Sequence, residues 1–180
     1  GCKSAQTGKH ARKGMPMRFV PAGDCALLRK AKRKEAMDIL ELKKYEGKYL
    51  SSAGGKIINP VTAWLNPKLI FVDCNTMECE FEVRPEMSDP LGILHGSMRA
   101  AMLCDTLGIL ANHPGSEVSA ITTGMTIDFI AKAFVGEKVT VIAEIIHKGS
   151  RLVYMSGTIL NEKKQIVAKG STRLFMLNRE

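Results

Sequence analysis

One short segment of the sequence combines a histidine, a glycine and the start of an apolar stretch. In the run Asp89-Pro-Leu-Gly-Ile-Leu-His95-Gly96-Ser97, His95 and Gly96 directly precede residues with apolar helical spacing. The first turn of a helix has backbone N–H groups without intrahelical acceptors and carries the positive end of the helix dipole. Such N–H groups can bind a carbonyl oxygen that becomes negatively charged during acyl transfer. The alternative is a histidine that only caps the helix, because a His-Gly pair alone has little specificity.

The surrounding sequence predicts an α+β fold. Alternating apolar patterns predict six strands, at residues 69–73, 77–83, 119–131, 138–147, 152–160 and 165–177. Short turns between successive strands favour antiparallel pairing. A helix is predicted over residues 96–111, and because it is apolar on nearly all sides we expect it to be buried. This order of elements favours a curled antiparallel sheet wrapped around a long central helix.

The first 56 residues differ from the rest in charge. They hold 14 Lys and Arg against 5 Asp and Glu, whereas residues 57–180 hold 12 against 13. Residues 1–23 contain no acid, four glycines and two prolines, which is typical of a flexible basic tail. Residues 24–56 are predicted to form a helical extension, with a helix from Asp24 to about Tyr45 and a turn-rich connector from Ser51 to Pro60. Residues 57–180 then form the main domain.

The composition argues against several classes of protein. No apolar run approaches the roughly 18 residues of a membrane span. The five cysteines are an odd number without a CxxC pair, which argues against a disulfide framework or a zinc site. They favour a reducing compartment inside the cell, with the cytoplasm as the first choice. The basic run at residues 29–34 has no stacking aromatic residues, so nucleic acid is not an expected partner, whereas a solvated face, anionic lipid or cofactor phosphates stay open.

The first residues permit several interpretations. Gly1 and Cys2, with basic residues behind them, could carry myristoyl and palmitoyl groups and so hold the protein at a membrane. Ala5 stands where the myristoylation pattern has Ser or Thr. An acid-free basic tail is also typical of a mitochondrial leader, although serines are few. An appended remnant is the third interpretation.

The segment around His95 resembles the hotdog acyl-CoA thioesterases, in particular the phenylacetate-type branch that includes the animal thioesterase-superfamily proteins. The motif of that branch is Asn, five residues, His-Gly-Gly, and an apolar helix with an acid nine residues after the histidine. Here Leu91-Gly-Ile-Leu-His95-Gly96 is similar to it. The later strands also match, from Thr122-Thr-Gly-Met-Thr-Ile-Asp-Phe129 through the turn Lys148-Gly-Ser-Arg151. The resemblance covers about residues 65–177.

Three positions depart from the motif. Asp89 stands at the amide position and brings a negative charge near the thioester, Ser97 replaces the second glycine, and the position nine residues after His95 is Cys104. Asp105 follows one residue later. One residue rotates a helix position by about 100°, so Cys104 and Asp105 face different ways. A regular helix would put Cys104 at the site, whereas a single π-bulge would restore Asp105 as the catalytic acid.

The resemblance implies hydrolysis of acyl-CoA thioesters at a dimer interface, in a homodimer or homotetramer, with a role in fatty acid metabolism. It implies that Gly96 N–H polarises the thioester carbonyl, that His95 orients the loop or the donor, and that Thr122 positions water. The helix carboxylate of one subunit would activate water, or attack, at the site of the other. No metal and no cofactor beyond the coenzyme A of the substrate is implied. The implied coenzyme A contacts are Phe129, Ala131, His147, Lys148, Gly149, Ser150 and Arg151.

Two other functions stay open. A non-catalytic hotdog module that holds acyl-CoA or a protein partner is favoured by Asp89 and Cys104, because both depart from the catalytic motif. A scaffold that uses residues 29–34 to contact RNA or a membrane is the third, and the absence of stacking aromatic residues weakens its RNA version. Hydrolysis across acyl-CoA chain lengths would separate the enzyme from the other two.

Overall fold

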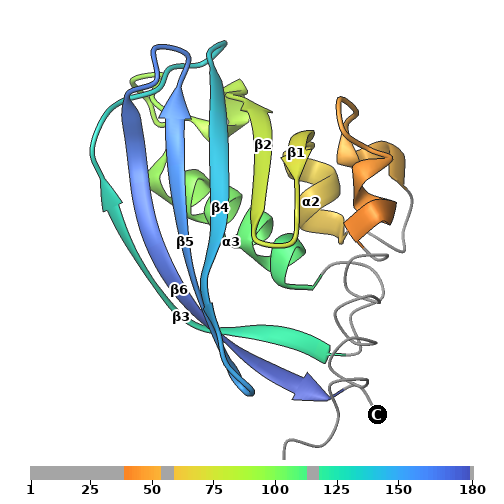
Figure 1. The fold of residues 1–180 in the computed structure, drawn as a ribbon. Coiled ribbons are helices and arrows are strands. Elements are labelled where there is room, and N and C mark those ends of the chain that lie inside the picture. The colour runs from red at the N-terminus through yellow and green to blue at the C-terminus, as the bar shows by residue number, and fades with distance from the viewer. Residues whose placement is uncertain (1–38, 54–58, 113–117, 179–180) are drawn as a thin grey trace, which may run out of the picture.

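The computed structural model describes residues 39–53, 59–112 and 118–178, and within them one antiparallel sheet carries a long helix on one face (Figure 1). The six strands lie in the order β1-β2-β4-β5-β6-β3. Each neighbouring pair is antiparallel. The predicted α+β architecture, a curled antiparallel sheet with a long helix packed on it, is therefore confirmed.

The strands begin and end within two residues of their predicted positions. They are β1 (Lys68–Val72), β2 (Thr76–Glu82), β3 (Val118–Phe129), β4 (Lys138–Lys148), β5 (Leu152–Asn161) and β6 (Ile166–Asn178). The predicted long helix is α3 (Gly96–Ala111). The described residues also contain two short 3-10 helices, η1 (Leu50–Ala53) and η2 (Pro85–Met87), and a short α-helix, α2.

The α-helix α2 (Pro60–Leu65) is not among the predicted elements, and it begins at the last residue of the predicted connector. Its ends are nevertheless encoded locally. The Asn59 side chain accepts from Thr62 N at 2.9 Å, Pro60 takes the first turn, and Asn66 closes the helix in the left-handed conformation at φ 52°. Of the predicted connector, residues 51–53 belong to η1 and residues 54–58 lie outside the described part of the chain.

The N-terminal predictions fall largely on residues that the structure does not describe. The tail at 1–23 lies wholly outside, and of the helix predicted from Asp24 only residues 39–43 are described as helical. Residues 47–50 then cover the edge of β1, through hydrogen bonds from Gly47 N to Leu69 O and from Leu69 N to Lys48 O. Among the described helices, none has the length and apolar character needed to cross a membrane.

Helix α3 packs directly on two glycines of the sheet. Gly157 of β5 and Gly170 of β6 are opposite each other in register. A Cβ at Gly157 would lie 2.6 Å from Leu103 Cδ2, and one at Gly170 would lie 3.5 Å from Leu103 Cδ1. Only a residue without a side chain admits this close approach. The fully buried core is formed by α3 and the facing side of the sheet, and includes Phe81, Met102, Leu103, Leu107, Val139 and Val141.

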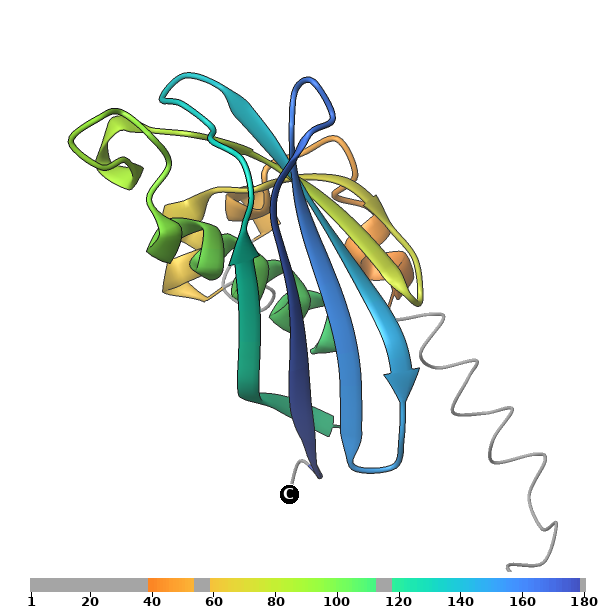
Figure 2. The same cartoon turned by 90° about the vertical axis from the view of Figure 1, so that its left-hand side faces the viewer.

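The prediction that α3 is buried on all sides is wrong for one stripe of its surface. Sheet and α2 cover only part of the helix. The uncovered stripe follows helical spacing and consists of small residues that are half-buried or exposed: Ser97, Ala101, Cys104, Gly108 and Ala111. The neighbouring strand β3 forms the outer edge of the sheet, and no described residue pairs with its free side (Figure 2). An uncovered apolar helix face therefore lies next to an open 12-residue strand edge.

Candidate active site

His95 is the N-cap of α3, as the sequence predicted for a helix-terminal histidine. Its backbone is extended (φ −63°, ψ 145°), and its Nδ1 accepts a hydrogen bond from Ser97 N at 3.2 Å. Ser97 Oγ lies 2.7 Å from the same nitrogen. A neutral imidazole that accepts at Nδ1 carries its proton on Nε2. The exposed ring of His95 therefore offers an N–H donor, rather than a base, at the start of α3.

Gly96 presents a backbone N–H at the same place. The carbonyl of His95 accepts from Met98 N at 3.0 Å and Arg99 N at 3.1 Å, so this peptide has its oxygen turned into the helix. In a trans peptide the N–H points the opposite way, which turns Gly96 N–H outward. No described residue accepts a hydrogen bond from it. A Cβ at Gly96 would lie 3.3 Å from Phe129 Cζ, so the end of the Phe129 ring lies against this glycine.

Arg99 lies beneath this helix start, and the sequence did not single it out. Its side chain donates from Nε to Leu94 O at 2.9 Å and from Nη1 to Ala131 O at 3.1 Å. Its guanidinium stands 5.6 Å from the centre of the Phe129 ring. The residue is only 7% exposed. Burial lowers the pKa of Arg99, and the charge of Asp89 partly raises it again.

Asp89 shapes the loop that leads to His95. Its Oδ1 accepts from Leu91 N at 2.8 Å and from Ile93 N at 3.0 Å. Gly92 completes this turn at a φ of 72°, a conformation that favours glycine. One carboxylate oxygen of Asp89 is thus occupied by loop amides, which gives the residue a structural part in holding the segment before His95.

The choice between Cys104 and Asp105 depends on the regularity of α3. Every residue from 96 to 111 is α-helical, so no π-bulge interrupts α3. Cys104 therefore lies on the uncovered stripe of α3. Asp105 faces α2 instead, where its Oδ1 accepts from Thr62 Oγ1 at 2.7 Å and from Asn59 Nδ2 at 3.4 Å. The sequence alternative that needed a bulge to restore Asp105 is not realised.

The carboxylate of Asp105 is only partly satisfied. Its Oδ2 is buried and has no hydrogen-bond partner among the described residues. Burial raises the pKa of Asp105, and the hydrogen bonds from Thr62 and then Asn59 lower it in part. Asp105 also contributes, after burial, to a raised pKa of the Cys79 thiol on β2. Asp105 thus fastens α2 to α3 at a polar site inside the subunit.

The remaining predicted site residues lie at the other end of the sheet. Thr122 of β3 is opposite Leu174, Leu174 is opposite Val153, and Val153 is opposite Lys148. One row across the sheet thus joins Thr122 to the turn that holds His147, Lys148, Gly149, Ser150 and Arg151. Phe129 lies seven residues further along β3 than Thr122, which is roughly 20 Å at the usual rise of a strand. One subunit brings His95, Gly96, Phe129 and Ala131 together, but not with Thr122 or the turn at 147–151.

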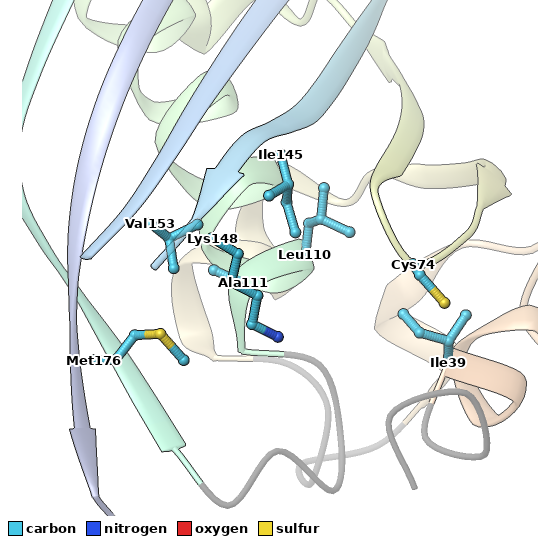
Figure 3. A pocket seen from close by; sticks show the side chains of 8 residues that line it. All are labelled: Ile39, Cys74, Leu110, Ala111, Ile145, Lys148, Val153 and Met176. Carbon is cyan, nitrogen blue, oxygen red and sulfur yellow. The ribbon is translucent and has the colours of Figure 1, made fainter. Parts of the chain in front are cut away.

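Two hollows lie away from His95. A small cavity of about 20 Å³ at the end of α3 is lined by Lys148, by apolar side chains from β4, β5, β6 and α3, and by Ile39 and Cys74 (Figure 3). That volume holds about one water and no acyl chain. A larger hollow of about 540 Å³ lies across β3, β5 and β6, beside Tyr154, Ser156 and Arg173. No predicted site residue except Lys148 lines either of them. Among the described residues, no cluster of three or more His, Cys, Asp and Glu could hold a metal ion.

Apolar side chains are exposed around the helix start. The loop before His95 and the loop after β3 meet in a bridge between Ile93 and Phe134. On these loops Leu91 is 77% exposed, Ile130 60% and Phe134 46%, and Phe129 at the end of β3 is 54% exposed. Exposed apolar groups gathered beside polar donors are typical of a surface that binds a ligand or a partner.

The sequence comparisons relate the chain to one family. The model of the thioesterase superfamily matches residues 91–168. Acyl-coenzyme A thioesterase 13 of mouse is 25% identical over 95 residues, which are 51% of this chain and 66% of the mouse protein, just under two thirds of that relative's length.

Solved structures resemble the chain in their fold. The Streptococcus mutans protein smu.793 bound to acetyl CoA has a TM-score of 0.60 at 18% identity, covering 64% of this chain and 91% of that one. The Escherichia coli PaaI protein from the phenylacetic acid degradation operon has a TM-score of 0.61 at 18% identity, covering 80% and 98%. The predicted hotdog fold is therefore confirmed. The family model and the mouse relative confirm the predicted resemblance to the thioesterase superfamily.

The thioesterase-superfamily match contains His95, Gly96, Cys104, Asp105, Thr122 and the turn at 147–151, while Asp89 precedes it. Sequence reasoning missed Arg99, Thr62 and Asn59. An arginine in an otherwise apolar helix was the signal for Arg99. The Asn59-Pro60 pair was the signal for the short helix that reaches Asp105.

Proposed function

We propose that this protein binds acyl-CoA thioesters at the start of α3 and hydrolyses them to the free acid and coenzyme A. One observation carries the proposal: Gly96 N–H has no acceptor among the described residues, and it stands beside the exposed ring of His95. Two donors at one point suit a thioester oxygen that gains negative charge as water attacks. The names of the mouse thioesterase and of the acetyl-CoA-bound S. mutans protein support acyl-CoA as the ligand.

We propose that a second copy of the chain completes this site. The open edge of β3 would pair with β3 of the partner, since an exposed strand edge of this length is normally covered. Antiparallel pairing about a two-fold axis brings the Thr122 end of the partner's strand towards the Phe129 end of this one. The turn at 147–151 of the partner would approach in the same way. The two groups of residues that one subunit keeps apart would thus meet.

In the reaction at such a site, the protein residues bind the oxyanion and position the water. Water adds to the thioester carbon, and the oxygen becomes an oxyanion held by Gly96 N–H and His95 Nε2–H. Thr122 of the partner subunit would position the water. The carbon–sulfur bond then breaks, and the thiolate of coenzyme A takes up the proton that the water loses. The exposed apolar groups at Leu91, Phe129 and Phe134 provide surface for the pantetheine arm and the acyl chain.

Retention of acyl-CoA without hydrolysis is the second candidate function. It is favoured by the regular helix, which puts Cys104 rather than an acid on the uncovered stripe of α3. The acid next to it, Asp105, is tied to Thr62 and Asn59 instead. Without a carboxylate to remove the proton of water, hydrolysis loses general-base assistance, which is typically worth about 10²–10⁴-fold in rate.

A panel of acyl-CoA substrates from acetyl to palmitoyl tests both functions. Release of coenzyme A gives kcat and KM, and calorimetry with coenzyme A gives the dissociation constant. Turnover above the uncatalysed rate supports the hydrolase, whereas micromolar binding without turnover supports the second candidate. Neither binding nor turnover would refute both. Light scattering at micromolar concentration should give at least twice the subunit mass of 19.7 kDa, and a monomer would refute the shared site.

A further inference from the structure

Arg99 donates hydrogen bonds to the two peptide groups that flank His95. The guanidinium Nε donates to Leu94 O at 2.9 Å, and the Arg99 backbone N–H donates to His95 O at 3.1 Å. The N–H of the Leu94–His95 peptide is also fixed, since His95 N donates to Met87 O at 2.9 Å. The Leu94–His95 peptide is thus held at both its oxygen and its N–H, and the His95–Gly96 peptide is held at its oxygen. Because a peptide group is planar, the direction of Gly96 N–H has little freedom.

The same guanidinium reaches the segment after β3. Its Nη1 donates to Ala131 O at 3.1 Å, and the Phe129 ring stands over it at 5.6 Å. Phe129 in turn touches Gly96, because a Cβ there would lie 3.3 Å from the ring. Arg99 thus links the helix start to the strand end that carries the proposed coenzyme A contacts. A buried arginine makes fixed, charge-assisted hydrogen bonds in a planar fork, which suits the alignment of two backbone segments.

We propose that Arg99 is a positioning residue of the thioester site, which sets the direction of Gly96 N–H relative to Phe129 and Ala131. This inference rests on the proposed function, because the thioester oxygen is the group that the N–H would meet. Arg99 itself touches no reacting atom. It acts through the backbone of Leu94 and Ala131, and a displacement of about 1 Å at a reacting group can cost on the order of 10²-fold in rate.

Arg99→Met tests the proposal, because it keeps an unbranched side chain of similar reach and removes every side-chain donor. We expect kcat to fall by about 10- to 100-fold, with KM and the dissociation constant of coenzyme A changed by less than about threefold. The oxyanion contact strengthens as the reaction proceeds, so the loss appears in kcat. Arg99→Lys keeps one donor and should recover part of the rate. Arg173→Met is the matched control, since Arg173 is exposed on β6 and lines the hollow beside Tyr154 instead.

Amide hydrogen exchange tests the positioning role of Arg99 independently of the proposed hydrolysis. Residues 89–96 and 129–134 should exchange faster in Arg99→Met than in Arg173→Met, whether or not acyl-CoA is hydrolysed. Faster exchange in a protein whose wild type is inactive would support the link and refute hydrolysis. Unchanged exchange, or a kcat equal to that of Arg173→Met, would overturn the positioning role. If Arg99→Met does not fold, the exchange rates and kcat of Arg99→Lys are compared with those of Arg173→Met instead.

Discussion

The oxyanion assignment can be tested at a single atom, the amide hydrogen of Gly96. Gly96→Pro deletes this hydrogen and leaves the helix able to form. Proline is favoured at the first helical position, and His95 already has the extended backbone (φ −63°, ψ 145°) that a residue before proline adopts. Loss of one donor to an oxyanion typically lowers kcat by about 10²–10³-fold. We expect a loss of that size with the fold preserved.

Gly96→Ala is the matched control, because alanine adds the same Cβ and retains the N–H. That Cβ would lie 3.3 Å from Phe129 Cζ, so the ring must yield by a few tenths of an ångström. Phe129 is 54% exposed and has room to move. We therefore expect kcat of Gly96→Ala within about threefold of wild type, the scale of an ordinary surface substitution.

The assay measures release of coenzyme A from the best acyl-CoA of the panel, for wild type and both variants. Thermal unfolding followed by circular dichroism verifies that both variants are folded. The ratio of the two kcat values isolates the N–H, since the added carbon is common to both. A folded Gly96→Pro protein as active as Gly96→Ala would refute the assignment of Gly96 N–H to the thioester oxygen.

Three further predictions concern α3 and its contacts. Cys104→Asp should raise turnover by placing a carboxylate nine residues after His95, whereas Asp105→Asn should leave kcat nearly unchanged; a large loss in Asp105→Asn would contradict the regular-helix account. Burial raises the folded-state pKa of Asp105 above its unfolded value near 3.8, so the stability that the protonated carboxyl contributes at low pH should be lost as the pH rises through the folded-state pKa. Urea unfolding should show the stability of Asp105→Asn relative to wild type increasing from pH 4 to pH 8, and a pH-independent difference would exclude this cause. Gly170→Ala should destabilise by about 1–3 kcal/mol, because its Cβ would lie 2.9 Å from the backbone oxygen of Thr126; an unfolding midpoint equal to that of wild type would show that the strands can separate there.

Local patterns in the sequence predicted the larger elements well. Alternation of apolar and polar residues located the strands, and the apolar run after Gly96 located α3, since both periodicities arise from the geometry of the chain itself. Helix α2 was missed because six residues are too few to show a helical period. Its caps at Asn59 and Asn66 were the remaining signals. The full burial of α3 was predicted wrongly, because composition gives the apolar character of a helix and not the number of layers that cover it.

The residues of the candidate site also divide into those that the local sequence predicts and those that it does not. His95 and Gly96 could be predicted because a helix start and its free N–H groups are local features. The contacts of Arg99 could not be predicted, since its acceptor at Ala131 lies 32 residues further along the chain. The position of Asp105 likewise depends on Thr62, which is 43 residues away and belongs to a helix that the sequence did not reveal.

The sequence by itself determined the order of the strands along the chain, the start of α3 and the donor groups there, because neighbouring residues decide these. The tertiary structure alone decided which of those groups meet. It separates His95 from Thr122 by the length of β3, turns Asp105 towards α2, and leaves the edge of β3 open beside the small-residue stripe of α3. Each of these follows from pairing and packing between distant segments, which no local pattern of residues records.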